Sequence, residues 1–207
     1  MIINPENLEN RDAYKLVVGA IVPRAIAFVS TIGEDGVLNL APFSTYTSVC
    51  VKPMIVCFSI TPRRDGCKKD TLRNIQYSKD FVINVVTHRL AEAMNKTSAD
   101  YPRHVDEFEE VGLTPVKSGI VKAPRLGESP INMECKLLNI LEFGESPNSA
   151  NLIIGEVILV HIRDEVYHDG EIQMDKLKPI GRLGGDLYCR INDVFEMRRP
   201  QILYDGE

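Results

Sequence analysis

The chain has 207 residues, of which 44% are hydrophobic and 26% charged, and its formal net charge is -5. This composition is typical of a folded globular protein, and no stretch is polar or repetitive enough to predict disorder. The acidic charge provides no general attraction for nucleic acid or for an anionic membrane surface, so neither is an expected partner.

We expect one domain over residues 1–207, because no internal repeat or low-complexity linker divides the chain. The longest apolar stretches, such as Leu152 to Ile162, are far shorter than the roughly 20 residues that cross a bilayer. The first residues lack the basic and apolar regions of a signal peptide, which predicts a cytoplasmic protein.

The cysteines and histidines predict neither disulfides nor a metal site. Five cysteines form an odd set without a C-x-x-C pair, and most sit beside apolar residues, as reduced and buried thiols do. Cys67 differs, because four basic residues surround it and can favour its thiolate. The four histidines show no metal-ligand spacing, so structural or surface roles are expected for them.

The first elements along the chain are a predicted helix and a predicted hairpin. Residues 7–18 place apolar side chains among charged ones, as in a short amphipathic helix. Two apolar runs at 25–32 and 37–42 flank the turn sequence GEDG at 33–36, which predicts a strand, a turn and a second strand.

The middle of the chain predicts further strands and short helices. The runs 55–60 and 81–87 are rich in β-branched and apolar residues and are expected in one sheet. Between them, Asp70 or Thr71 is the predicted N-cap of a short helix. Residues 90–94 predict another short helix, and the polar, acidic segment 97–112 is predicted to be a loop.

Two long strands are predicted next. Residues 133–143 alternate between apolar and charged side chains, with Glu134 opposite the apolar face. Residues 152–162 are the expected partner strand across a turn at 146–149. The chain thus has at least six strong β runs and no alternating βαβ pattern. The predicted fold class is mainly β, a closed or nearly closed antiparallel β-barrel with helical additions.

Four basic residues directly precede the predicted helix start, namely Arg63, Arg64, Lys68 and Lys69. The backbone N–H groups at the start of a helix add to their positive field, and together they indicate an anion site. A solvated basic loop is an equally good explanation, because Asp65 and Asp70 dilute the charge, and no Walker-type phosphate loop is indicated.

A run of small and polar residues ends the second predicted strand. It reads NLAPFS at 39–44, and the hairpin brings Ser30 and Thr31 near it, with Ser59 on the next strand. Small side chains let a flat ring approach the backbone, and ligand sites combine an apolar wall with a few polar groups. Ordinary turn residues after a strand are the alternative.

The segment 179–188 contains three glycines beside Arg182 and can fold over a ligand, although such segments serve turns more often. No G-x-S-x-G motif, pair of catalytic carboxylates or Rossmann fingerprint occurs. If the protein is an enzyme, a cofactor must therefore supply its reactivity.

Five segments together resemble the flavin reductase-like family of FMN-binding split barrels, in family order along nearly the whole chain. They are PRAIAFVST at 23–31, NLAPFS at 39–44, KDTLRN at 69–74, NKTS at 95–98 and PIGRLGG at 179–185. The resemblance implies a split barrel that forms a homodimer, with FMN near the subunit interface.

The resemblance also implies which residues hold FMN, which is bound without a covalent link. The ring and ribityl chain are assigned to Ser30, Thr31, Asn39, Ala41, Ser44 and Ser59. The phosphate is assigned to Lys69 and Thr71, with Arg63 as a helper. The implied cofactor-binding set is completed by Leu40, Asp70, Asn95, Thr97 and Ser98.

The expected function is that of an NAD(P)H-dependent flavin reductase, which transfers hydride to FMN and onward to an unspecified acceptor. A non-catalytic FMN-binding electron-transfer protein of the flavoredoxin type is the alternative and would share these residues. A barrel for another anionic ligand or for nucleic acid is a third alternative, against which the acidic charge counts. No residue is assigned as catalytic, and the roles of Arg182 and His161 stay open.

Overall fold

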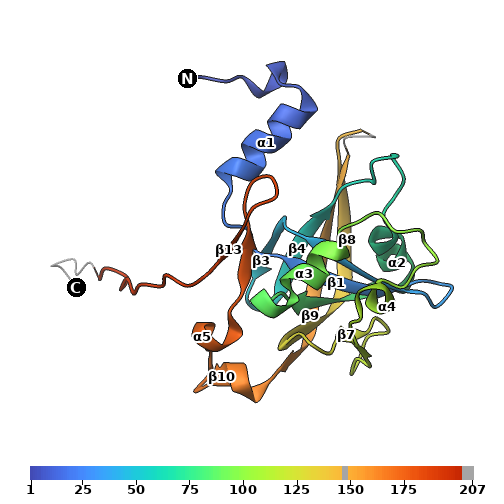
Figure 1. The fold of residues 1–207 in the computed structure, drawn as a ribbon, viewed down its shortest axis with the longest axis vertical. Coiled ribbons are helices and arrows are strands. Elements are labelled where there is room, and N and C mark those ends of the chain that lie inside the picture. Colours follow the sequence, from blue (N-terminus) through green and yellow to red (C-terminus); the bar gives the residue numbers. More distant parts are fainter. Residues whose placement is uncertain (146–148, 202–207) are drawn as a thin grey trace.

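The computed structural model describes residues 1–145 and 149–201, and strands dominate its regular structure (Figure 1). The main sheet consists of β1 (Ala27–Ile32), β2 (Leu38–Phe43), β3 (Tyr46–Cys50), β4 (Ile55–Ile60), β5 (Asp80–Val85), β8 (Ile131–Phe143) and β9 (Ala150–Ile162). The short paired strands are β6 (Pro115–Val116) with β7 (Arg125–Leu126), β10 (Tyr167–His168) with β11 (Glu171–Ile172), and β12 (Ile180–Arg182) with β13 (Tyr188–Arg190).

Helical segments flank the sheet. The α-helices are α1 (Asn10–Ala20), α2 (Asp70–Ser78), α3 (Ala91–Lys96), α4 (Glu107–Val111) and α5 (Met174–Leu177). Three single turns of 3-10 helix are η1 (Pro5–Asn7), η2 (His88–Leu90) and η3 (Asp164–Val166). Helix α1 stands clear of the sheet near the N-terminus, whereas α2, α3 and α4 lie against it (Figure 1).

The main sheet is antiparallel and curls on itself. Its strand order is β2-β1-β5-β8-β9-β4-β3, so β2 and β3 are the two edges. Only Ser44 and Thr45 separate these edge strands in the chain, which keeps the two edges close together and forces the sheet to curl. The predicted mainly β class is confirmed, and the curled sheet, which is not closed by pairing of β2 with β3, is a split barrel.

The interior of the barrel is apolar because alternate residues of each strand face inward. The ring of Phe58 lies between those of Phe43 and Phe81, with centroid distances of 5.3 and 5.5 Å. Helix α2 packs its buried apolar side chains against the same core. Thr31 and Asn39 lie opposite each other on the inward face of β1 and β2, so this face becomes polar beside α2.

Helices cover the outward face of β1 and β2. Phe28 and Leu40 project there and join a second core with Met94 of α3 and Phe108 of α4. This packing holds both helices beside β2. The segment that connects them, residues 97–106, consequently runs past the free edge of that strand.

The predicted strands are confirmed. The hairpin at 25–42 is β1 and β2, and the two long strands are β8 and β9, paired along their length. The pairing of β8 with β9 shifts register between Leu137 and Asn139, and this bulge explains why the sequence alternation breaks at Leu138. The predicted turn at 146–149 falls mainly on residues 146–148, which lie outside the described residues.

Two local predictions are wrong. Helix α2 begins at Asp70, so the N-cap position belongs to Lys69, and no side chain caps the helix. The segment 97–112 is not entirely a loop, because it contains helix α4. The carboxylate of Asp106 accepts the N–H of Phe108 at 2.8 Å, and Gly112 ends the helix at φ +67°. A helix this short shows no periodicity in the sequence. Its N-cap residue and the glycine that ends it are nevertheless helix signals that the sequence contains.

Within residues 1–145 and 149–201, no helix is long and apolar enough to cross a membrane. The five cysteines are free thiols. Cys135 is fully buried and Cys67 is exposed, while the other three are half-buried.

Candidate functional site

A pocket lies along the free edge of β2, and we call it the β2-edge pocket. It is lined by Asn39, Ala41, Pro42, Phe43, Arg63, Lys69, Asp70, Thr71, Thr97, Ser98, Ala99, Asp100 and Glu107. Four parts of the chain meet here: strand β2, the start of α2 with the basic segment before it, the residues after α3, and the start of α4. Eight of the predicted cofactor-binding residues are therefore brought together.

Two cations of this pocket carry ion pairs within it. The Lys69 ammonium lies 2.9 Å from Oδ1 of Asp100, and both side chains are partly exposed. The Arg63 guanidinium donates to the carboxylate of Asp70 and to the backbone carbonyl of Tyr101. The hydrogen bond from Lys69 holds the pKa of Asp100 below its usual range. An entering anion therefore meets cations that are already oriented toward the pocket.

The start of α2 adds a second anion-binding feature. The N–H groups of Leu72 and Arg73 donate to the Lys69 carbonyl, but those of Asp70 and Thr71 come before the first intrahelical acceptor, and Lys69 offers no side-chain acceptor. Helix starts carry a partial positive charge, so these N–H groups favour an anion beside them.

A buried network of hydrogen bonds supports the inner wall of the pocket. Oδ1 of Asn39 accepts the hydroxyls of Thr31 at 3.1 Å and of Thr71 at 2.7 Å. The hydroxyl of Thr31 in turn accepts Nδ2 of Asn74 at 3.0 Å. All four side chains are almost fully buried, so the network ties β1 and β2 to the first turns of α2.

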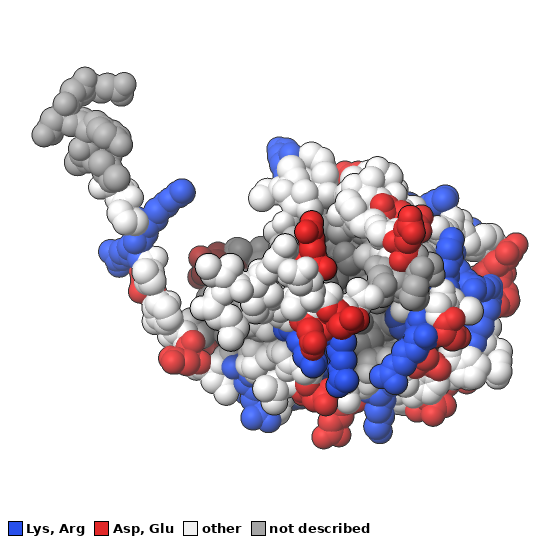
Figure 2. All heavy atoms as spheres, turned by 90° about the horizontal axis from the view of Figure 1, so that it is seen from above, with Lys and Arg blue, Asp and Glu red and all other residues white. Residues whose placement is uncertain are grey.

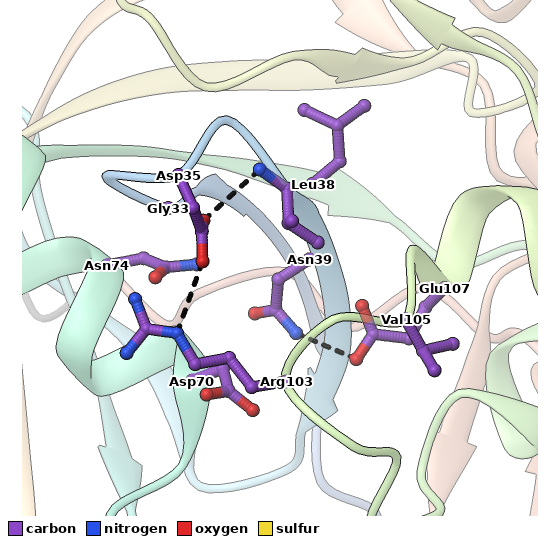
Figure 3. Close-up of a pocket in the computed structure, with 10 residues that line it drawn as sticks. Gly33, Asp35, Leu38, Asn39, Asp70, Asn74, Arg103, Val105 and Glu107 are labelled. Atoms are coloured by element: carbon purple, nitrogen blue, oxygen red, sulfur yellow. Dashed lines mark hydrogen bonds and ion pairs between the residues drawn. The ribbon is translucent and has the colours of Figure 1, made fainter.

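Like Ala99 and Asp100, Glu107 lines the pocket although the sequence did not reveal it. It is 6% exposed, and its Oε1 and Oε2 accept Nδ2 of Asn39 at 2.9 Å and the N–H of Leu40 at 3.1 Å. Figure 3 shows its carboxylate, from α4, directed at the Asn39 amide of β2. Burial raises the pKa of Glu107 to about 7, against the lowering effect of these hydrogen bonds, with Asp70 adding to the rise.

A second pocket adjoins the first and shares Pro42 and Ser98 with it; we call it the Tyr188 pocket. It is lined by Tyr14, Ile26, Pro42, Ser44, Met94, Asn95, Ser98, Arg182, Asp186 and Tyr188. Its volume of about 320 Å³ is within the range of small-molecule sites.

The glycine-rich segment forms one wall of the Tyr188 pocket. The guanidinium of Arg182 lies over the Tyr188 ring at 4.4 Å from its centroid, a cation-π contact. The Tyr188 hydroxyl donates to Oδ1 of Asn95 at 3.2 Å. The predicted covering segment is thus a hairpin of β12 and β13 that presents a flat, stacked pair to the pocket.

The structure distributes the predicted cofactor-binding residues over the two pockets. Those in the β2-edge pocket are Asn39, Ala41, Arg63, Lys69, Asp70, Thr71, Thr97 and Ser98. Ser44 and Asn95 line the Tyr188 pocket. The other predicted residues, which line neither pocket, are Ser30, Thr31, Leu40 and Ser59.

Strand geometry explains why these four lie apart. Ser30 and Thr31 are neighbours in β1 and point to opposite faces; Ser30 donates to the carbonyl of Pro124, away from the pockets. Leu40 packs in the outer core, and only its N–H reaches Glu107. Thr31 does not line the pocket itself, but its hydroxyl donates to the side chain of Asn39, which does. The N–H of Ser59 bonds to Thr45, and its side chain is half-buried outside both pockets.

His161, whose role the sequence left open, belongs to a different part of the molecule. Its Nε2 lies 2.6 Å from Oε1 of Glu134, and Glu134 also accepts the N–H groups of residues 119, 120 and 121. Burial opposes the ionisation of Glu134, but these hydrogen bonds outweigh it and lower its pKa to about 2. The carboxylate therefore anchors a loop. Among the described residues, no three His, Cys, Asp or Glu side chains are grouped to hold a metal ion.

Comparison with known proteins identifies the family. Residues 19–174 match the model of the flavin reductase like domain. The chain belongs to the flavin reductase-like family. Membership in it makes this chain a flavin-related oxidoreductase, in agreement with the split barrel and with the two adjoining pockets.

Relatives of similar length support this membership. Nitrilotriacetate monooxygenase component B from Bacillus cereus is 35% identical, with a TM-score of 0.91 over 95% of this chain and 98% of that one. The 2-nitrobenzoate 2-nitroreductase NbaA of Pseudomonas fluorescens is 30% identical, with a TM-score of 0.88 over the whole of both chains. A protein of Halalkalibacterium halodurans is 38% identical over 209 residues, covering all of both chains.

Proposed function

We propose that this chain is a single-domain FMN-binding oxidoreductase that accepts hydride from NADH or NADPH and passes electrons to a further acceptor. The phosphate is assigned to the β2-edge pocket and the ring to the adjoining Tyr188 pocket. The observation that carries the proposal is the meeting of Lys69, the start of α2 and the small residues of β2 in one pocket of a flavin reductase-like chain.

The residues of the two pockets fit the cofactor chemically. Lys69 and Arg63 supply positive charge for a phosphate, and Thr71 holds the first turn of α2 against Asn39. Ala41 and Ala99 leave room near the backbone for the phosphate end of the ligand. FMN, when bound, supplies the hydride-accepting and electron-donating chemistry, so the protein contributes binding, orientation and exclusion of water.

The surface supports the proposal of a homodimer. Helix α1 and residues 191–201 stand away from the body of the molecule, the latter as an arm in Figure 2. Both carry large exposed apolar side chains, with Tyr14 65%, Phe195 77% and Met197 81% exposed. A second copy of the chain would cover such surface, and Tyr14 also lines the Tyr188 pocket.

The names of two relatives support a catalytic role over passive electron carriage. One relative is a component of a monooxygenase and the other is a nitroreductase, each at least 30% identical over nearly the full chain. Each name belongs to an oxidoreductase or to a component of one. The acceptor of this chain is thus proposed to be a partner enzyme or a small organic molecule.

Rapid anaerobic mixing tests the function directly. The protein loaded with FMN is mixed with NADH and, separately, with NADPH, while the absorbance of oxidised flavin is followed. We expect that absorbance to fall with at least one nucleotide, because hydride transfer reduces the flavin. If neither nucleotide bleaches it, the reductase proposal fails and a non-catalytic electron-transfer protein replaces it. A protein that binds no FMN at all excludes both.

A further inference from the structure

Glu107 occupies an unusual position for an acidic residue. It is almost fully buried, and it lines the pocket to which a phosphate is assigned. Its carboxylate accepts hydrogen bonds from the side chain of Asn39 and from the backbone of Leu40, at the free edge of β2. Helix α4 places it there by packing the next residue, Phe108, into the outer core. The position is therefore fixed by the fold and is not that of a solvated side chain.

The hydrogen bonds of Glu107 set the orientation of Asn39. Because Nδ2 of Asn39 is engaged by Glu107, Oδ1 points the other way and accepts the hydroxyl of Thr71, in the first turn of α2 (Figure 3 shows the Asn39–Glu107 pair). A protonated carboxyl group keeps acceptor capacity and gains one O–H donor. The network thus tolerates both protonation states of Glu107.

The charged groups around Glu107 leave no cation to compensate its own ionised carboxylate beside a bound phosphate. Within the β2-edge pocket, the charged residues near Glu107 are Arg63, Lys69 and Asp70 on the α2 side and Asp100 in the segment after α3. On its other side, in the small pocket drawn in Figure 3, lie Arg103 and Asp35, joined by an ion pair of 3.3 Å. On its own helix and cap are Asp106, Glu109 and Glu110.

Each nearby cation is already matched by a carboxylate. Arg63 is paired with Asp70, and Lys69 with Asp100. A phosphate monoester brings a charge between about -1.5 and -2 near pH 7. An ionised Glu107 beside it would be an uncompensated like charge in a pocket partly removed from water, where such repulsion is weakly screened.

We propose that Glu107 is the specificity-determining residue at the phosphate end of the flavin site, taking up one proton when a phosphate monoester binds and opposing the monoester when ionised. This inference rests on the proposed function. The raised pKa of Glu107, about 7, places the change of protonation in the neutral range. The second ionisation of a phosphate monoester is centred near pH 6, so the charge of the ligand is nearly constant above pH 7.

The proposal makes a pH-dependent distinction between two flavins. FMN affinity should fall as the pH rises above 7, by up to about tenfold per pH unit, because one proton is taken up on binding. Riboflavin, which has the ring and ribityl chain without the phosphate, should show no comparable change. The discrimination in favour of FMN should therefore be larger at pH 7 than at pH 8.5.

The test is a fluorescence titration with FMN and with riboflavin at several pH values from 7 to 8.5. The proteins are the natural chain, Glu107→Gln, and Glu109→Gln as the matched control on the exposed face of the same helix. We expect the FMN affinity of Glu107→Gln to be nearly constant over this pH range. The affinity of Glu109→Gln should change with pH as that of the natural chain does. His104→Asn is a second control, because this exposed histidine precedes α4 in the chain.

Calorimetry of the natural chain provides a measurement that needs no variant. FMN binding is measured at pH 7.5 in two buffers of different ionisation enthalpy, and the difference gives the protons taken up. Uptake with FMN and none with riboflavin is expected. An FMN affinity that does not change with pH, or one that changes equally in Glu107→Gln, overturns the role of Glu107 alone. Failure of both flavins to bind at every pH overturns the proposed function as well.

Discussion

The Lys69 ammonium and the Asp100 carboxylate form an ion pair of 2.9 Å inside the β2-edge pocket. Both side chains are partly exposed, and pairs of this kind contribute only about 0 to 1 kcal/mol. A charge-assisted hydrogen bond to a phosphate is stronger. Lys69 is therefore held near the site by a partner that an incoming phosphate can displace.

Replacing Lys69 by alanine should weaken FMN binding by about 1 to 3 kcal/mol, the scale of a hydrogen bond to a charged group. Riboflavin binding should stay the same, because riboflavin carries no phosphate. Equilibrium titration with both flavins measures the two effects. Lys68→Ala is the matched control, since Lys68 is exposed and does not line the pocket. Equal losses for both flavins would place the phosphate elsewhere.

Removing the charge of Asp100, which competes with the phosphate for Lys69, should strengthen FMN binding. In Asp100→Asn, Lys69 loses its anionic partner and is free for the ligand. FMN affinity should rise by about 0.2 to 1 kcal/mol, the usual contribution of such an exposed pair. The same titration at low salt is the measurement. Weaker FMN binding in Asp100→Asn would show that Asp100 positions Lys69 and does not compete for it.

Tyr188 should matter for the ring and not for the phosphate. Its ring stacks under Arg182 and lines the second pocket. Tyr188→Ala should weaken FMN and riboflavin equally, by about 0.5 to 1.5 kcal/mol, the contribution of an aromatic contact. Tyr188→Phe keeps the ring and loses only the hydroxyl bond to Asn95, so it is the control for stacking. An effect on FMN alone would contradict the assignment of the ring to this pocket.

The strands and the cationic side of the site could be predicted because their signals are local in the sequence. Apolar, β-branched runs mark β1, β4 and β5, and the basic segment directly precedes α2. These features need only neighbouring residues, so composition and spacing are sufficient to find them.

Glu107 and the bond between Tyr188 and Asn95 could not be predicted, because they depend on contacts between distant residues. Glu107 meets Asn39 across 68 positions, and Tyr188 meets Asn95 across 93. A sequence motif also does not show toward which face of the sheet each side chain points. Ser30 and Thr31 are adjacent in one motif, yet strand geometry sends their side chains to opposite sides of the sheet.

Glu134 should stabilise the fold in a pH-dependent way. Its folded-state pKa of about 2 lies below the ordinary value of 4.5, so its stabilisation is complete above about pH 4.5 and is lost as the pH falls toward 2. Glu134→Gln should lower the free energy of unfolding at pH 7 by on the order of 1 to 3 kcal/mol. Urea unfolding at pH 7 and pH 3 measures both values.

The difference between Glu134→Gln and the natural chain should shrink at pH 3, where the natural carboxylate loses part of its advantage. Glu142→Gln, an exposed substitution on the same strand, should have little effect at either pH. A difference that is as large at pH 3 as at pH 7 would mean that the shape of Glu134, and not its charge, holds the loop.

A crystal structure of the protein with FMN is the most direct test of the proposed site. We expect the phosphate beside Lys69 and the first turn of α2, with the isoalloxazine ring extending past Pro42 toward Tyr188. Electron density that places the phosphate away from Lys69 and α2 would contradict the account.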